Sequence, residues 1–279
     1  ANSHCMKCNA QLGYIATEKD MGTFTKLDDG IWIASNDSYQ TKEFKPCYNY
    51  TNYQVCNWMI PANQENKYCE SCQLTHVIPN LNNPDNIVYW SRIEHAKRRF
   101  LYLMQQLNIM PRPKKSSDDR YGLSFIFMMP EPYQPVMTGH ANGVITLNAS
   151  EADVVYRETT RIKMGENYRT LLGHFRHESG HYYFDLMIAH KPDFIEEFRM
   201  LFGDERKDYS EALKKHYNEG PPTDWQSKFV SSYASTHPWE DWAETWAHYL
   251  HMMDTLETAY HAGLVVKTNK NDLNSMEIL

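Results

Sequence analysis

The sequence lacks long apolar runs, an excess of positive charge and, over most of its length, cysteine. No apolar stretch approaches the roughly 20 residues that a helix needs to cross a bilayer, so we expect no membrane span. The net charge of −7 is unlike the basic balance of nucleic-acid binders, and we expect the basic run at 97–99 on a solvated helix face. The 279 residues, 42% of them hydrophobic, suffice for one large domain, or for a main domain and a small one.

Cysteine is confined to the first quarter of the chain, and residues 73–279 have none. The six cysteines are Cys5, Cys8, Cys47, Cys56, Cys69 and Cys72. In a small secreted domain the two C-x-x-C pairs would suggest disulfides. Their segregation at one end of a larger chain fits a small zinc-stapled module in a reducing compartment better. We therefore expect bound zinc and a cytoplasmic protein.

The last four cysteines supply enough thiolates for one tetrahedral, structural zinc. They are Cys47, Cys56, Cys69 and Cys72. The segment around them shows no helical periodicity and is expected to have little core of its own, so it needs such a staple. Cys5 and Cys8 form half a site. A partner knuckle upstream, or His4 with water, would complete it; otherwise the pair stays free of metal.

The chain is expected to divide near a linker-like stretch, "IPNLNNPDN" at 78–86. Residues 1–82 form the predicted zinc-ribbon module. Residues 83–279 open with helical spacing, continue with two strand-like apolar runs, and then read as helices. The last of these helices starts at the proline of "PWEDWAETWAHYLH". The predicted fold class is α+β: a small N-terminal zinc ribbon followed by a mainly helical domain with a small sheet.

The stretch "HFRHESGHYYFD" at 174–185 contains the pattern H-E-x-x-H. On a helix, His177 and His181 lie on one face, where two imidazoles can converge on a single zinc ion. Glu178 lies beside the pair and can act on a water bound to the metal. The pattern also occurs by chance in amphipathic helices with surface histidines. Context therefore has to decide whether it binds metal.

A catalytic zinc needs a third protein ligand, and the best donors stand on a later predicted helix. Glu240 and Glu244 are four residues apart, so one can bind the ion while the other holds an imidazole N–H of a ligand histidine. Asp241 points about 100° away from them and is a poorer candidate. Asp185, four residues after His181, can orient a ligand or cap a partner.

This arrangement of H-E-x-x-H followed by Glu-x-x-x-Glu resembles the gluzincin metallopeptidases. The resemblance implies a zincin-like domain in which Glu240 is the third zinc ligand. Glu244 would then hold a ligand histidine without binding the ion itself. The chain also resembles a bacterial family of zinc-binding metallopeptidases with an N-terminal zinc ribbon. That likeness rests on "HFRHESGHYYFD", "GDERKDYSEALKKHY", "VSSYASTHPWEDWAETWAHYLH" and "TGHANGVITLNASEAD". The family ribbon usually opens with a further C-x-x-C, which implies a knuckle ahead of Cys5 and a second structural zinc in the full-length protein.

A more distant likeness to lethal-factor-type toxins concerns the catalytic groups. Those enzymes place a tyrosine seven residues before the ligand glutamate, and Tyr233 holds that position here. A tyrosine hydroxyl suits oxyanion stabilisation because it donates a hydrogen bond without carrying charge; the alternative is a packed loop tyrosine. His237, in the loop before the Glu240 helix, is a candidate for a substrate or oxyanion contact. Glu178 would take the proton of a zinc-activated water and pass it to the leaving amine.

The predicted function is zinc-dependent peptide hydrolysis, with a protein or peptide as the substrate. A zinc-ribbon interaction module with a non-catalytic zincin scaffold is an alternative, although every hydrolytic residue is present. A zinc amidohydrolase acting on a non-peptide amide is another, and only substrate profiling separates it from a peptidase.

Overall fold

The cysteine-rich segment folds into a closed five-stranded barrel. The computed structural model describes residues 3–28, 30–35 and 42–264 of the chain. The barrel strands follow one another in chain order and close by a parallel pairing of β1 with β5. They are β1 (Gln11–Ile15), β2 (Asp20–Lys26), β3 (Trp32–Ala34), β4 (Glu43–Pro46) and β5 (Trp58–Pro61). Two one-turn helices, α1 (Tyr48–Thr51) and α2 (Glu70–Gln73), flank β5 and carry cysteines at their starts.

The barrel strands bury several aromatic rings. Phe24 lies edge-on to Phe44, with ring centroids 5.6 Å apart, and Tyr14 packs on Trp58 at 4.7 Å. All four side chains are buried. The barrel residues share one hydrophobic core with α3, to whose Gln105 the Tyr14 hydroxyl donates at 2.8 Å. The strands are too short for their alternation to stand out in the sequence, but each contributes a large ring.

A second, four-stranded sheet has the order β6-β7-β9-β8. Its strands are β6 (Thr75–Val77), β7 (Ser124–Met128), β8 (Gly139–Ala141) and β9 (Val144–Asn148). β6, β7 and β9 run parallel, and β8 is an antiparallel edge strand. Because β6 already belongs to this sheet, the chain leaves the barrel before the predicted boundary at residue 82. The division into domains stays a prediction.

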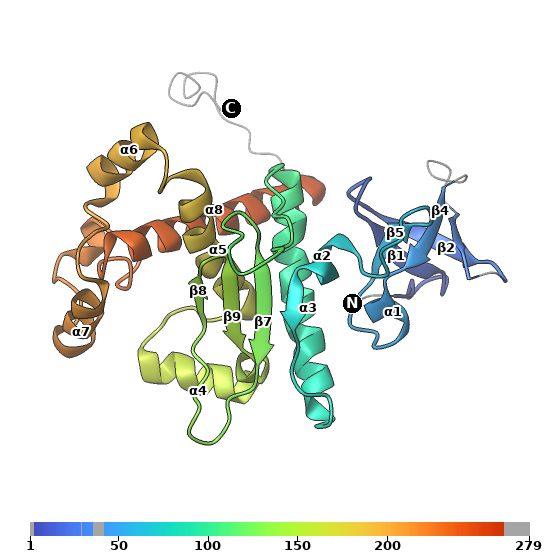
Figure 1. Cartoon of the computed structure of the whole chain (residues 1–279), viewed down its shortest axis with the longest axis horizontal. Coiled ribbons are helices and arrows are strands. Elements are labelled where there is room, and N and C mark those ends of the chain that lie inside the picture. The colour runs from blue at the N-terminus through green and yellow to red at the C-terminus, as the bar shows by residue number, and fades with distance from the viewer. Residues whose placement is uncertain (1–2, 29, 36–41, 265–279) are drawn as a thin grey trace.

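Helices make up most of the second part, as Figure 1 shows. They are α3 (Asp85–Gln106), η1 (Ala149–Ala152), α4 (Val154–Met164), α5 (Leu171–Met187), α6 (Pro192–Phe202), α7 (Tyr209–Glu219), η2 (Trp225–Ser227) and α8 (Pro238–His261). Phe175 of α5 stacks on Phe100 of α3 and meets Phe125 of β7 edge-on at 5.3 Å, which joins sheet and helices in one core. The predicted α+β class, with a ribbon-like first part, is confirmed. No helix among the described residues is long and apolar enough to span a membrane.

Helix α3 stands between the barrel and the second sheet and links them through buried charges (Figure 1). Lys97 Nζ lies 2.8 Å from Glu94 Oε2, and both side chains are fully buried. Arg98 donates to the carbonyl of Val55 in the cysteine-rich part at 2.6 Å. The expectation that 97–99 is a solvated face was wrong for Lys97 and Arg98. Buried charges of this kind persist only when paired, as these are.

Helices α5 and α8 pack unusually closely at Gly180. A Cβ on Gly180 would lie 2.8 Å from the Cα of Ala243, closer than real side chains approach a backbone atom. The Trp242 indole N–H donates to the Gly180 carbonyl at 2.8 Å, which fixes the contact. Since Gly180 lies inside H-E-x-x-H, this approach sets how near α8 comes to the two histidines.

We predict that Gly180→Ala destabilises the protein by about 1–3 kcal/mol, because the methyl group overpacks a rigid backbone contact. Gly139→Ala is the matched control, since a Cβ there meets nothing within 4 Å. Urea denaturation measures both. If both variants unfold at the same urea concentration, α5 and α8 can move apart without a loss of stability, which would contradict the prediction.

Candidate metal centres

Three predicted ligands meet between α5 and α8. His177 and His181 lie one helical turn apart on α5, with ring centroids 5.0 Å apart. Glu240 comes from the first turn of α8, where the positive end of the helix dipole favours a carboxylate. Its Oε2 lies 3.0 Å from Nε2 of His177 and 3.6 Å from Nε2 of His181. The three ligand atoms all lie within 4.8 Å of one another.

These distances suit a zinc ion. Ligands at 2.0–2.1 Å from a tetrahedral ion lie about 3.3 Å apart, which falls between the two distances given above. Glu240 is only 1% exposed, and no described residue donates a hydrogen bond to its Oε2. Burial raises the pKa of Glu240, but the two imidazoles outweigh it and hold that pKa well below its usual value. A buried, ionised and half-unpaired carboxylate needs a cation.

Glu244 lies against the far side of His177. Its Oε1 is 2.6 Å from Nδ1 of His177, and its Oε2 accepts a hydrogen bond from Ser231 at 2.7 Å. With Nε2 turned to the ion, His177 would keep its proton on Nδ1 and donate it to Glu244. This is the contact that the Glu-x-x-x-Glu spacing suggested, and its role in orienting His177 stays a prediction.

The ring of His181 is held by packing. Trp239 lies against it, with ring centroids 4.1 Å apart. No described residue forms a hydrogen bond with Nδ1 of His181. Burial raises the pKa of Asp185, while the nearby His181 and His190 act to lower it, and no hydrogen bond or ion pair joins Asp185 to a described histidine. The orienting role of Asp185 stays a prediction.

Glu178 and Tyr233 border the same site. Glu178 is 7% exposed and receives no hydrogen bond from a described residue, so its carboxylate is available to a water molecule. The ring of Tyr233 lies 6.0 Å from that of His177. Burial, and then the charge of Glu240, raise the pKa of Tyr233 far above its usual value. Its hydroxyl therefore stays protonated and can donate a hydrogen bond.

His237 serves the fold in this structure. It is the N-cap of α8, where its Nδ1 accepts from the backbone N–H of Trp239 at 3.1 Å. Its Nε2 donates to the carbonyl of Lys207, also at 3.1 Å. With both ring nitrogens used and only 4% of its surface exposed, His237 has no free atom for a substrate. The predicted substrate or oxyanion contact of His237 stays a prediction, and in this geometry it has no free ring nitrogen to make it. Asn, Asp, Ser and Thr are the usual N-caps, so nothing in the sequence pointed to a histidine cap.

Tyr209 also belongs to this site, although nothing in the sequence predicted it. Its hydroxyl donates to Oε1 of Glu240 at 2.6 Å. Tyr209 stands at the start of α7, far from both metal motifs in the sequence and among 19 tyrosines. Asp208 is a recognisable N-cap and predicts that a helix starts at Tyr209, but it does not predict the contact with Glu240.

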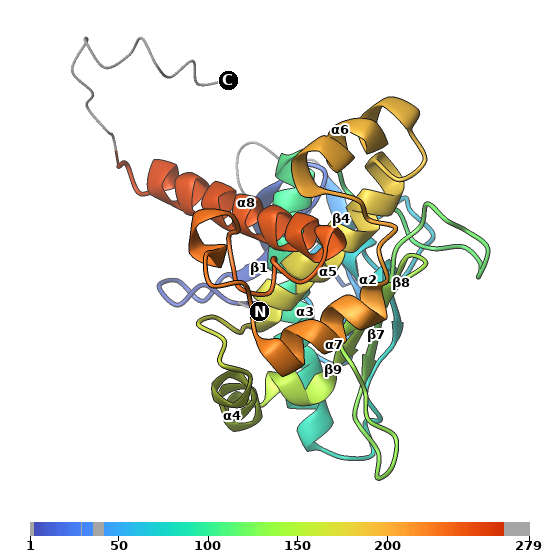
Figure 2. The same ribbon diagram turned by 90° about the vertical axis from the view of Figure 1, so that its left-hand side faces the viewer.

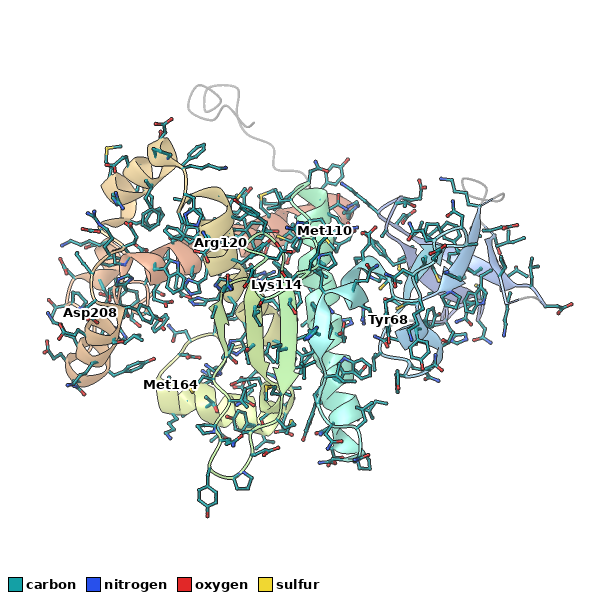
Figure 3. The ribbon with its side chains drawn as sticks, in the orientation of Figure 1. Tyr68, Met110, Lys114, Arg120, Met164 and Asp208 are labelled. Atoms are coloured by element: carbon teal, nitrogen blue, oxygen red, sulfur yellow. The ribbon has the colours of Figure 1, made fainter. Side chains whose placement is uncertain are left out.

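The four-cysteine group lies in the barrel part, away from the first site. In Figure 3, Tyr68 marks this end of the molecule and Asp208 marks the other. The group comprises Cys47, Cys56, Cys69 and Cys72, all buried, with sulfur atoms within 4.8 Å of one another. The Cys56 and Cys69 sulfurs are 3.7 Å apart. Sulfurs at 2.3 Å from a tetrahedral zinc lie about 3.8 Å apart, whereas a disulfide requires about 2.05 Å.

The charges of these thiols also favour a cation. Burial raises the pKa of Cys56, but the three neighbouring thiols, with Arg98, outweigh it and lower that pKa well below its usual value. The pKa of Cys69 is raised well above its usual value by burial and by the other thiols. Without a metal only part of the group can ionise. A zinc ion would stabilise all four as thiolates.

Cys5 and Cys8 have no further ligand among the described residues, in which only the two groups above have metal-type geometry. His4 contacts Ser3 through Nδ1 rather than completing the pair. The backbone N–H groups of Cys8 and Lys7 lower the pKa of Cys5. The half-site prediction stays open.

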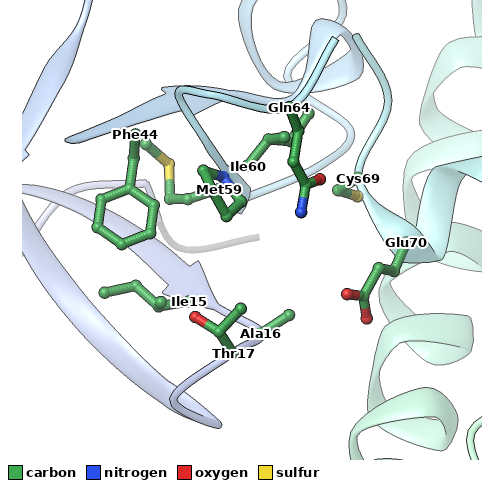
Figure 4. Close-up of a pocket in the computed structure, with 10 residues that line it drawn as sticks. Ile15, Ala16, Thr17, Phe44, Met59, Ile60, Gln64, Cys69 and Glu70 are labelled. Carbon is green, nitrogen blue, oxygen red and sulfur yellow. The ribbon is translucent and has the colours of Figure 1, made fainter. Parts of the chain in front are cut away.

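A small pocket in the barrel borders Cys69 (Figure 4). Its lining includes Ile15, Phe44 and Glu70. The cavity volume of about 10 Å³ admits no more than a single water, so it is no substrate site.

Comparison with known proteins gives matches along nearly the whole chain. Residues 86–278 match the family described as "Putative zinc-binding metallo-peptidase", and residues 1–83 match a zinc-ribbon domain family. Relatives include the uncharacterized proteins Mb2598c of Mycobacterium bovis and Rv2568c of Mycobacterium tuberculosis. Each is 43% identical over 263 residues, which covers 94% of this chain and 72% of the relative. No solved structure matches. The buried donor sets agree with these matches, and the chain belongs to the family that this description names.

Proposed function

We propose that the chain is a gluzincin-type zinc peptidase that hydrolyses peptide bonds at the site between α5 and α8. The observation that carries the proposal is the buried Oε2 of Glu240, which faces Nε2 of both His177 and His181 and has no other described partner. In this proposal these three residues hold one catalytic zinc, and the four buried cysteines hold one structural zinc. Thiolate ligands suit a reducing compartment, so we place the protein in the bacterial cytoplasm.

Zinc at this site would supply Lewis acidity, which lowers the pKa of water and polarises a peptide carbonyl. Glu178 is the general base of the proposal. It stands next to His177 in the sequence, is nearly buried, and has no described hydrogen-bond donor, so its oxygens remain free to accept a proton from water. The same carboxyl group then returns the proton to the leaving amine.

Tyr233 is the proposed hydrogen-bond donor to the oxyanion. It packs near His177 and keeps its proton because burial and Glu240 raise its pKa. A neutral donor in a largely buried site stabilises developing negative charge without competing for the proton that Glu178 carries.

The zinc content of the chain tests the ligand sets. We expect about two zinc ions per chain, and the loss of about one in His177→Ala/His181→Ala. His190→Ala/His261→Ala is the matched control, since both histidines are exposed. Cys56→Ser should lose the other ion. Elemental analysis of the purified proteins measures all four, and an unchanged count in the first variant would refute the catalytic site.

The role of Glu178 is tested by Glu178→Gln. This change keeps the shape but removes the base, so we expect peptide cleavage to fall by about 10²–10⁴-fold while zinc is retained. Glu197→Gln on α6 is the matched control, because Glu197 is exposed. Cleavage of a peptide library identifies a substrate first. Full activity in Glu178→Gln would assign the base elsewhere.

A further inference from the structure

The two carboxylate oxygens of Glu240 have different surroundings. Oε1 accepts the hydroxyl hydrogen of Tyr209 at 2.6 Å. Oε2 accepts no hydrogen bond from a described residue and faces Nε2 of both histidines. One oxygen is therefore occupied by the protein, and the other is presented to the ion.

Tyr209 is itself held firmly in place. Its ring meets the rings of His237 and Trp239 edge-on, at centroid distances of 5.4 and 5.8 Å. Two residues earlier, the carbonyl of Lys207 accepts the hydrogen bond from His237 Nε2. Because His237 also caps α8, the chain entering α7 is fixed to the helix end that carries Glu240. Figure 2 shows α7 on the side of the molecule where α8 begins.

We propose that Tyr209 is a positioning residue that makes Glu240 a one-oxygen ligand of the metal. A carboxylate can bind zinc through one oxygen or two, and a strong hydrogen bond to Oε1 keeps that oxygen from turning to the ion. A catalytic zinc with three protein ligands needs its fourth position open for water, which a second oxygen from Glu240 would crowd. This inference rests on the proposed function, and it gives His237 a structural part in place of a catalytic one.

Tyr209→Phe tests the inference, because it removes only the hydroxyl and keeps the ring that packs on His237 and Trp239. Tyr260→Phe is the control: it removes an exposed tyrosine hydroxyl near the far end of α8, away from Glu240. Zinc affinity is measured by chelator competition on the full chain. The His177→Ala/His181→Ala variant lacks the α5–α8 site, so the zinc that it retains is assigned to the cysteine group. The site is then loaded with Co²⁺, and its visible absorption is recorded.

We expect Tyr209→Phe to bind zinc about 10–100-fold more weakly at the α5–α8 site, as is typical when a group supporting a ligand is removed. Its Co²⁺ absorption should weaken per bound ion, because a second oxygen raises the coordination number. Tyr260→Phe should match the wild type in both measurements.

Three outcomes would overturn the inference. If Tyr209→Phe matches the wild type, the hydroxyl does not position Glu240. If affinity falls but the Co²⁺ spectrum is unchanged, Tyr209 supports the fold without setting the ligand mode. In both cases the proposed function stands. If the wild type holds no zinc beyond that of the ribbon, both the inference and the proposed function fail.

Discussion

The burial of one carboxylate, that of Glu240, constrains the whole region between α5 and α8. A charge with 1% exposure is unfavourable unless other charges and hydrogen bonds surround it. The protein surrounds it with two imidazoles, one tyrosine hydroxyl and the positive end of a helix. These groups come from α5, α7 and α8, so the three helices must meet at this point. A zinc ion would neutralise the rest of the negative charge on Glu240.

The close approach of α5 and α8 follows from the same constraint. Histidine and glutamate side chains reach a common ion only if their helices lie near each other, and Gly180 with Ala243 removes the side chains that would keep them apart. The indole of Trp242 then ties the two backbones. In the barrel part, the metal ligands are brought together in a different way. The buried aromatic rings of the barrel position the strands, and four cysteines converge beside them.

The sequence predicted those features that depend on local spacing. The helices α3 and α8 follow from periodicity and from proline at a helix start. The pairing of His177 with His181, and of Glu240 with Glu244, depends on a spacing of four residues. Features that depend on contacts between distant segments were not predictable. Tyr209 on Glu240 has no spacing signal, and the basic run that includes Lys97 looks solvated until its buried partner Glu94 is seen.

X-ray absorption at the zinc K-edge of the purified chain tests the central claim most directly, because it reports which atoms surround the metal. The account predicts sulfur neighbours at about 2.3 Å from the cysteine group together with nitrogen and oxygen neighbours at about 2.0–2.1 Å from His177, His181 and Glu240. A spectrum with sulfur neighbours alone would contradict it. The helices α5 and α8 would then form a scaffold that holds no zinc.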